Sequence, residues 1–84
     1  MTEKEVGRVI HYFNKISVAI VRISSGKLSI GDSIHIEGTT TDFTQPVKSI
    51  QIDGESVDRA SKGKEVGIKV KKQARQNDVV SLVT

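Results

Sequence analysis

Cysteine is absent from this 84-residue chain, and aromatic residues are limited to Tyr12, Phe13 and Phe43. The lack of thiols excludes disulfide bonds, thiolate metal ligands and cysteine nucleophiles. No apolar run approaches the roughly 20 residues that cross a bilayer. The charged segment 1–5 also lacks the apolar core of a secretory signal. We therefore expect a cytoplasmic protein with no membrane partner, built as one domain over residues 1–84.

Basic residues are concentrated in one segment of the chain. The net charge is only +3, whereas residues 59–75 contain seven basic residues and a single acidic one, Glu65. A local excess of this kind is typical of a surface that binds an anionic partner, although lysines also keep exposed strands soluble. The basic residues of the segment are Arg59, Lys62, Lys64, Lys69, Lys71, Lys72 and Arg75.

Short apolar runs separated by turn residues, with almost no helical periodicity, predict an all-β barrel or sandwich. The single proline, Pro46, cannot donate to a ladder and should lie at an edge, a strand start or a bulge. Asn14 and Asp53-Gly54 suit tight turns. The expected strands cover residues 6–13, 16–23, 33–37, 44–52, 55–57, 66–72 and 79–83.

Residues 65–72 show the clearest strand pattern, because apolar and basic side chains alternate along them. Successive side chains of a strand point to opposite faces, so one face should enter the core and the other should be cationic. Two lysines on the cationic face would lie about 6.7 Å apart. The core face consists of Val66, Ile68 and Val70, and these lysines are Lys69 and Lys71.

The expected strand 16–23 is apolar on both faces. One interpretation is a β-bulge that changes the register, since bulges are common where small barrels turn corners. The other is an apolar outer face that a partner covers. The sequence leaves both interpretations open.

Four short segments follow one another over nearly the whole chain: VGRV at 6–9, SGKLSIGDSI at 25–34, VKSIQIDGESV at 47–57 and ASKGKEVGI at 60–68. In this order and spacing they resemble the second domain of the translational GTPases, the elongation factor Tu group. The resemblance implies a closed six-stranded Greek-key β-barrel. It also implies positive φ angles at Gly31 and Gly63, and a close backbone approach at Gly67.

The GTP-binding domain that stands beside this barrel in the family has no counterpart here. A phosphate loop needs Gly-x4-Gly-Lys-Ser/Thr, so that backbone amides hold phosphate and a hydroxyl holds magnesium. Gly26-Lys27 precedes Leu28 and Gly63-Lys64 precedes Glu65, so neither pair is a phosphate loop. We expect no GTP binding.

Binding of an aminoacyl-tRNA end is also not expected. Family members that carry aminoacyl-tRNA offer an acidic residue and an arginine to its terminal nucleotide. The matching positions here hold Gln51 and Gly54. The resemblance then implies contacts of the same barrel with ribosomal RNA or with neighbouring protein domains.

No set of side chains predicts catalysis or a metal site. His11 and His35 are the only histidines, and a metal site would need carboxylates that the fold brings together. We interpret both as histidines on a strand surface, and we expect no enzyme activity, metal or other cofactor. Phe13 or Phe43 should enter the core, and Tyr12 should stay partly exposed.

The basic segment is the strongest functional candidate. The leading hypothesis is a non-enzymatic, translation elongation factor-like module that binds ribosomal or transfer RNA. The alternative is a protein-interaction module that docks on an enzyme or a ribosomal protein through an apolar barrel face. Only RNA binding should weaken steeply with salt. The expected RNA contacts are Lys62, Lys64, Lys69, Lys71, Lys72 and Arg75, with Tyr12 stacking on a base.

Overall fold

The computed structural model describes residues 2–84, which form only strands, turns and loops. The prediction of the all-β class is confirmed. In this part of the chain there is no helix that could span a membrane. The strands are β1 (Glu3–Phe13), β2 (Val18–Ile23), β3 (Lys27–Ser29), β4 (Ser33–Glu37), β5 (Asp42–Pro46), β6 (Ile50–Ile52), β7 (Glu55–Val57), β8 (Arg59–Ser61), β9 (Glu65–Lys69) and β10 (Val79–Val83).

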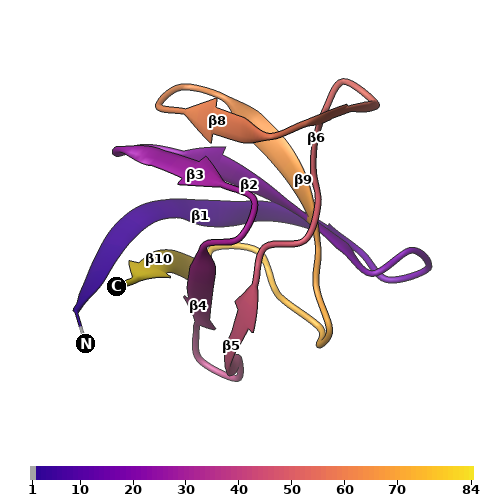
Figure 1. The fold of residues 1–84 in the computed structure, drawn as a ribbon. Coiled ribbons are helices and arrows are strands. Elements are labelled where there is room, and N and C mark those ends of the chain that lie inside the picture. Colours follow the sequence, from indigo (N-terminus) through magenta and orange to yellow (C-terminus); the bar gives the residue numbers. More distant parts are fainter. Residues whose placement is uncertain (1) are drawn as a thin grey trace.

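Eight of these strands form one antiparallel sheet that curls around the core (Figure 1). Their order in the sheet is β5-β4-β10-β1-β2-β9-β6-β7, and β3 pairs separately with β8. The long strand β1 pairs with β10 on one side and with β2 on the other. At its start, Thr2 and Thr84 each donate a backbone N–H to the other's carbonyl oxygen at 2.8 Å. The two ends of the described chain therefore lie side by side.

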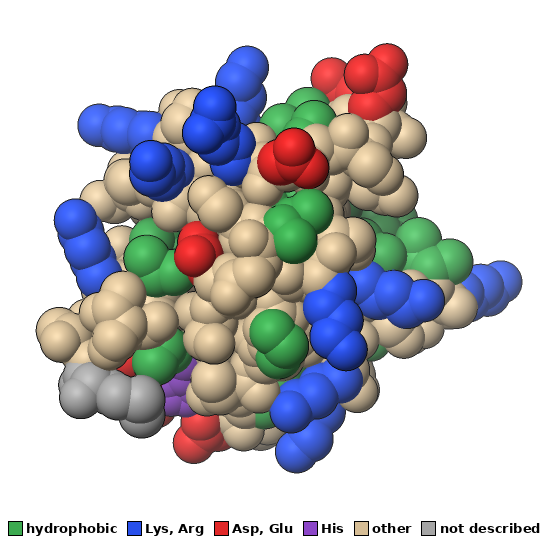
Figure 2. Space-filling model, viewed as in Figure 1, with side chains coloured by type: hydrophobic (Ala, Val, Ile, Leu, Met, Phe, Trp, Pro, Cys, Tyr) green, Lys and Arg blue, Asp and Glu red, His purple; other side chains and the backbone are tan. Residues whose placement is uncertain are grey.

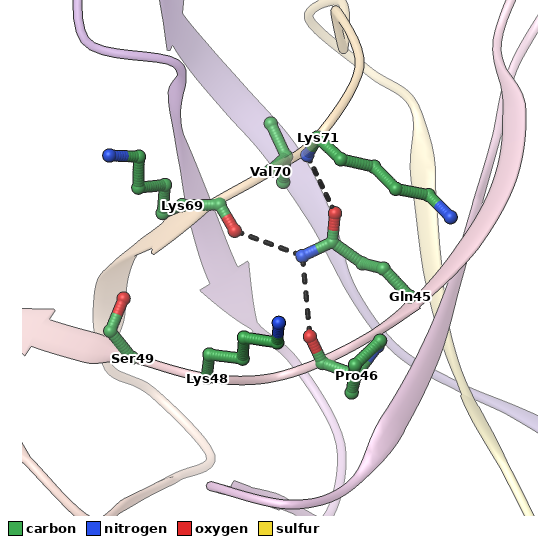
Figure 3. Close-up of a pocket in the computed structure, with 7 residues that line it drawn as sticks. All are labelled: Gln45, Pro46, Lys48, Ser49, Lys69, Val70 and Lys71. Carbon is green, nitrogen blue, oxygen red and sulfur yellow. Dashed lines mark hydrogen bonds between the residues drawn. The ribbon is translucent and has the colours of Figure 1, made fainter.

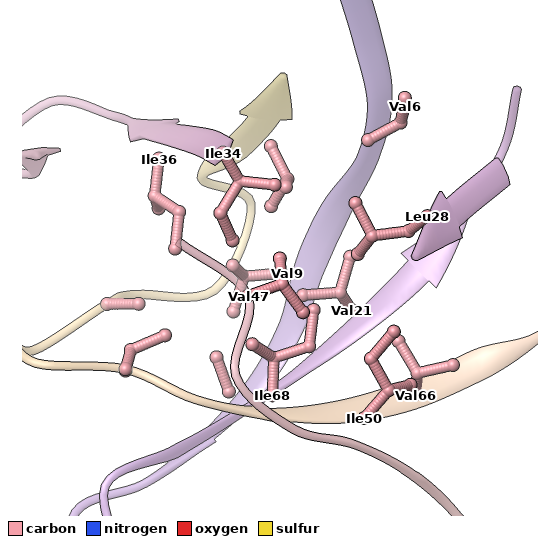
Figure 4. Packing of buried hydrophobic residues seen from close by; sticks show 14 of the residues in the cluster. Val6, Val9, Val21, Leu28, Ile34, Ile36, Val47, Ile50, Val66 and Ile68 are labelled. Carbon is pink, nitrogen blue, oxygen red and sulfur yellow. The ribbon is translucent and has the colours of Figure 1, made fainter. Parts of the chain in front are cut away.

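Aliphatic and β-branched side chains fill the interior of the curled sheet (Figure 4). Val9 of β1, Val21 of β2 and Ile34 of β4 are fully excluded from solvent, although they come from well-separated parts of the sequence. Burial of each such side chain contributes about 1.5–3 kcal/mol to folding. The core thus holds the strands together where turns alone would not.

Strand β9 has the alternation that the sequence predicts. Val66 and Ile68 are buried, Lys69 is exposed, and Val70 is buried just beyond the end of the strand. The predicted direction of the core face is therefore confirmed. The strand ends at Lys69, however, so the prediction that it continues to residue 72 is wrong.

A β-bulge lies opposite the run that is apolar on both faces. The register between β1 and β2 shifts between Val9 and His11, so the bulge is in β1 rather than in the apolar run itself. The outer face of β2 is half-buried, because Val18 and Ile20 lie over Gly67 of β9. A Cβ at that glycine would come within 3.2 Å of one side chain and 3.5 Å of the other. The close approach predicted at Gly67 is real, but side chains make it.

The expected strand 44–52 is interrupted in the middle. The backbone of Val47 pairs with the turn before β4. Its carbonyl oxygen accepts from the N–H of Gly31 at 2.9 Å, and its N–H donates to the backbone carbonyl oxygen of Asp32 at 2.7 Å. Pro46 ends β5 just before this point, at the edge of the sheet order, where the lack of an N–H is tolerated. The chain resumes pairing only at Ile50 of β6.

The ladder of the described strands does not run continuously around the core. Strands β5 and β7 end the eight-stranded order, and the β3–β8 pair stands outside it. The six closed strands expected from the resemblance are represented by ten shorter strands in two sheets. The positive φ angles expected at Gly31 and Gly63 are confirmed, at 96° and 92°.

Candidate binding site at the seam between β5 and the end of β9

A side chain joins the two parts of the sheet that backbone pairing leaves apart. The amide of Gln45, on β5, donates to the carbonyl oxygen of Lys69 at 2.9 Å and accepts from the N–H of Lys71 at 2.8 Å. It also points toward the carbonyl of Pro46, at 3.4 Å. The side-chain amide of Gln45 thus pairs with the carbonyl of Lys69 and the backbone N–H of Lys71. A neighbouring strand would pair with these two groups in the same way. We call this junction, residues 45–49 with residues 69–71, the seam.

The seam is hollowed into a groove of about 280 Å³ (Figure 3). The buried Gln45 amide lies between its two walls, and exposed lysines stand on both. This volume is just below the roughly 300–1,000 Å³ of small-molecule sites. The groove therefore fits a side chain with its flanking peptide groups better than a cofactor. Its lining residues are Gln45, Pro46, Lys48, Ser49, Lys69, Val70 and Lys71.

The lysines of the groove are not neutralised by the protein. Across residues 2–84 the ion pairs within 4.0 Å join Glu5 to Arg8 and link His35 to two carboxylates. None of them involves Lys48, Lys69 or Lys71. Three positive charges therefore face solvent around a mostly apolar hollow, an arrangement that attracts an anionic group.

The basic residues predicted as one RNA-binding surface lie in more than one place. Lys69 and Lys71 line the seam groove, but only Lys69 belongs to β9. Lys64 lies in the turn before β9 and lines a different hollow with Lys27 and Arg59. Figure 2 accordingly shows separate groups of blue side chains on the visible face.

The rest of the predicted set lies in loops. Lys62 is in the turn between β8 and β9, and Lys72 and Arg75 are exposed in the segment that leads to β10. The nearby Asp78 carboxylate accepts a hydrogen bond from the backbone N–H of Arg75, at 2.8 Å, so the loop is held locally. No single strand face therefore displays all of these residues.

The aromatic residues lie largely as expected. Phe43 is in the core and Tyr12 is half-buried against it. Phe13 is 45% exposed at the end of β1, and its ring meets His11 edge-on, with ring centres 4.4 Å apart. None of them lines the seam groove. Tyr12, which was predicted to stack on a base, therefore does not share a site with the groove lysines.

His35 forms a cluster that the sequence did not predict. Its Nδ1 lies 2.8 Å from Glu3 Oε1 and its Nε2 lies 2.5 Å from Asp42 Oδ1. Hydrogen bonds to Glu3 and then to Asp42 raise the pKa of His35 to about 9, against a smaller lowering by desolvation. The imidazolium form donates both of its N–H groups, so the cluster joins β1, β4 and β5.

The His35 cluster is also the place in residues 2–84 where protein ligands for a metal come together. Ligand atoms of His35, Glu37 and Asp42 lie within 4.8 Å of one another. Both carboxylates are exposed, and His35 already pairs with Asp42. The geometry is therefore accounted for by an ion-pair cluster.

Two curated relatives match most of this chain. A collagenase of Porphyromonas gingivalis is 42% identical over 74 residues, which are 87% of this chain and 20% of that protein. A protease of Methanocaldococcus jannaschii, otherwise uncharacterized, is 41% identical over 80 residues, or 94% of this chain and 19% of that protein. The chain thus spans about a fifth of the length of these relatives.

Solved structures share the fold closely. The C-terminal domain of a Geobacillus thermoleovorans protein, assigned to the U32 peptidases, superimposes with a TM-score of 0.89. The match covers 96% of this chain and 93% of that domain, at 23% sequence identity. A selenomethionine form of the same domain gives a TM-score of 0.86 at 24% identity. The fold of this chain is therefore shared with a solved domain.

These relatives correct the functional prediction. The proteins that are 41–42% identical to this chain over the aligned 74 and 80 residues are named as a collagenase and a protease, not as translation or ribosome factors. The prediction of a translation elongation factor-like, RNA- and ribosome-binding module is therefore wrong, and so are its associated roles in protein biosynthesis. The motifs that carried it form turns and core contacts, and these specify a fold rather than a function.

The resemblance in fold family is nevertheless confirmed by direct comparison. The family model of elongation factor Tu domain 2 matches residues 17–81, which include β2 to β9 and most of β10. This chain therefore belongs to the elongation factor Tu domain 2 family.

Proposed function

We propose that this chain is a non-catalytic domain of a U32 peptidase-type protein, in which a separate part carries out hydrolysis. The observation that supports this most directly is the identity of 41–42% to proteins named collagenase and protease, of which the chain covers only about a fifth. A domain of this size and share is suited to binding or positioning rather than to the whole reaction.

The chemistry of the described residues favours a non-catalytic role. Peptide hydrolysis by a side-chain nucleophile needs a base beside a hydroxyl or thiol. Among residues 2–84, the hydrogen bonds of His35 go to carboxylates, and His11 contacts an aromatic ring instead of a hydroxyl. The sequence has no cysteine. These contacts suit a structural scaffold.

We also propose that the domain is a closed β-barrel of the translation-factor type, with the seam as its last junction. The amide of Gln45 would complete the barrel where the backbone ladder stops. A closed barrel has no free strand edge, and it gives a rigid base for a binding surface. The absence of thiols is consistent with the cytoplasmic location that we continue to propose.

A domain replacement in the Porphyromonas gingivalis collagenase tests the proposal. The segment that matches this chain is deleted, or is replaced by this chain, and cleavage of a protein substrate is measured beside cleavage of a short peptide. We expect deletion to impair cleavage of the protein substrate more than that of the peptide, and we expect the replacement to restore it.

The controls separate folding from function. A replacement that carries Ile68→Asp, which places a charge in the core, should behave like the deletion. The isolated chain should cleave neither substrate. Cleavage by the isolated chain, or full activity of the deletion, would refute the proposed role.

A further inference from the structure

We propose that the seam groove binds an extended peptide segment that carries acidic side chains. The inference rests on the proposed function only in its choice of a protein ligand, and it assigns a site and a ligand class to the domain. Its physical basis is a combination of unpaired backbone, uncompensated positive charge and an apolar floor along one groove.

Unpaired backbone groups provide the first part of the argument. Lys48 and Ser49 lie between β5 and β6, outside any strand, and no backbone–backbone hydrogen bond of residues 2–84 involves the N–H or C=O of either. Such groups on an extended segment can pair with an added peptide strand, which gains affinity from main-chain hydrogen bonds. The opposite wall is less available, because Gln45 already holds the N–H of Lys71.

The charges around the groove determine which peptide fits. Lys48 stands on one wall and Lys69 and Lys71 on the other, each exposed and each without a carboxylate within 4.0 Å among the described residues. Glutamate or aspartate side chains on an extended peptide would be attracted to them, whereas a basic peptide would be repelled. The alternation of side chains along a strand places every second one on the same face.

The apolar floor distinguishes a peptide from a nucleic acid. The lining of the groove includes Pro46 and Val70 and no aromatic ring. A single-stranded nucleic acid usually stacks its bases on aromatic side chains, and this groove offers none. An aliphatic side chain two positions from an acidic one lies on the same face of an extended peptide, and it would fill the hollow instead.

The test is a binding titration with labelled probe peptides. One probe carries glutamate and leucine in turn at every second position, with serine between them, so that both side chains lie on one face of the extended peptide. Its matched control has lysine in place of each glutamate. The protein is used as wild type, as the groove variant Lys48→Gln/Lys69→Gln/Lys71→Gln, and as the equally neutralised control variant Lys27→Gln/Lys62→Gln/Lys64→Gln, whose lysines lie outside the groove. Thermal melts check that all three proteins fold.

The acidic probe should bind the wild type and the control variant with similar affinity, and it should bind the groove variant about tenfold more weakly. Each exposed ion pair contributes little alone, so the loss of all three together should produce a change of only this size. The amide resonances of Lys48 and Ser49 should shift most on binding. Equal weakening in both variants, or equal binding of the basic probe, would overturn the groove assignment.

Two further readings separate this inference from the alternatives. If an oligouridylate RNA binds through the same three lysines and the acidic peptide does not, the ligand class is wrong. The probe is also examined by mass spectrometry after the titration. Its cleavage by the purified chain would refute the non-catalytic function and leave the assignment of the groove to be judged by the binding data.

Discussion

His35 shows how a single residue can make this fold depend on pH. Its imidazole lies between Glu3 and Asp42, only 15% of its side chain is exposed, and these two hydrogen bonds raise its pKa to about 9. An unfolded chain holds histidine near its ordinary pKa of about 6.5. The folded state therefore binds a proton more tightly than the unfolded state.

The stability from this cluster should be complete below about pH 6.5 and should be lost as the pH rises through about 9. We expect the urea concentration at the unfolding midpoint of the wild type to decrease as the pH is raised from about 6 to about 9.5. In His35→Gln the midpoint should be lower at pH 6 and should change less over the same interval. His11→Gln, which leaves the cluster intact, should follow the wild type. The same slope in His35→Gln and wild type would show that the cluster does not titrate in this range.

Ile68 is the residue whose truncation should cost the most stability in β9. Its side chain is fully buried, so Ile68→Ala should lower the free energy of unfolding by about 2–5 kcal/mol. Ile16→Ala is a suitable control, because Ile16 is 59% exposed in the turn after β1. Chemical denaturation measures both. An unchanged midpoint for Ile68→Ala would contradict the packing of this strand.

At the scale of elements, the seam depends on one side chain instead of a ladder. Gln45 is 7% exposed and uses its oxygen and nitrogen to pair β5 with the end of β9. A backbone pair at this place would need Val47 and its neighbours to turn toward β9. The backbone of Val47 instead pairs with the turn before β4.

Gln45→Met keeps the volume of the side chain and removes its hydrogen bonds. We expect a loss of about 1–3 kcal/mol, because the carbonyl of Lys69 and the N–H of Lys71 are left without their partner. Hydrogen exchange at the amide of Lys71 should quicken more than at the amides of β1. Gln51→Met, at an exposed position of β6, is the matched control. Unaltered exchange at Lys71 would mean that the Gln45 amide does not hold the seam.

Local pattern predicted the elements better than their junctions. The alternation around Ile68 and the positive φ angles of Gly31 and Gly63 depend on neighbouring residues, so they could be read from the sequence. A glutamine on a strand looks like a surface residue, and nothing local marks Gln45 as buried. His35 meets Glu3 across 32 residues, and only the paired strands bring them together.

The candidate site was predicted only in part, for the same reason. The basic pattern marks Lys69 and Lys71 as candidates, but their groove also needs Lys48 and Ser49, and no local pattern groups these two residues with them. The early end of β9 follows from the pairing of Lys71 with a side chain. The alternation of apolar and basic residues continues past the end of β9, so the sequence pattern does not mark where the strand stops.

At the scale of the whole molecule, the two Gly-Lys pairs of the chain lie in strand turns. Gly26 and Gly63 have positive φ angles, and each is followed by a strand, not by the helix of a phosphate loop. We expect calorimetry with GTP and magnesium to give no binding, with an intact translational GTPase as the positive control. Micromolar affinity for GTP would contradict this expectation.

The paired ends of the described chain bring Thr2 and Thr84 to one corner of the fold. Because Thr2 and Thr84 hydrogen-bond to each other, segments joined to both ends would leave from one corner, at the opposite end of β1 from its turn with β2 (Figure 1). The domain could then be inserted into a loop of a host protein through two adjacent linkers, without distortion of its own strands. Its seam would stay free to meet a polypeptide that the host holds nearby.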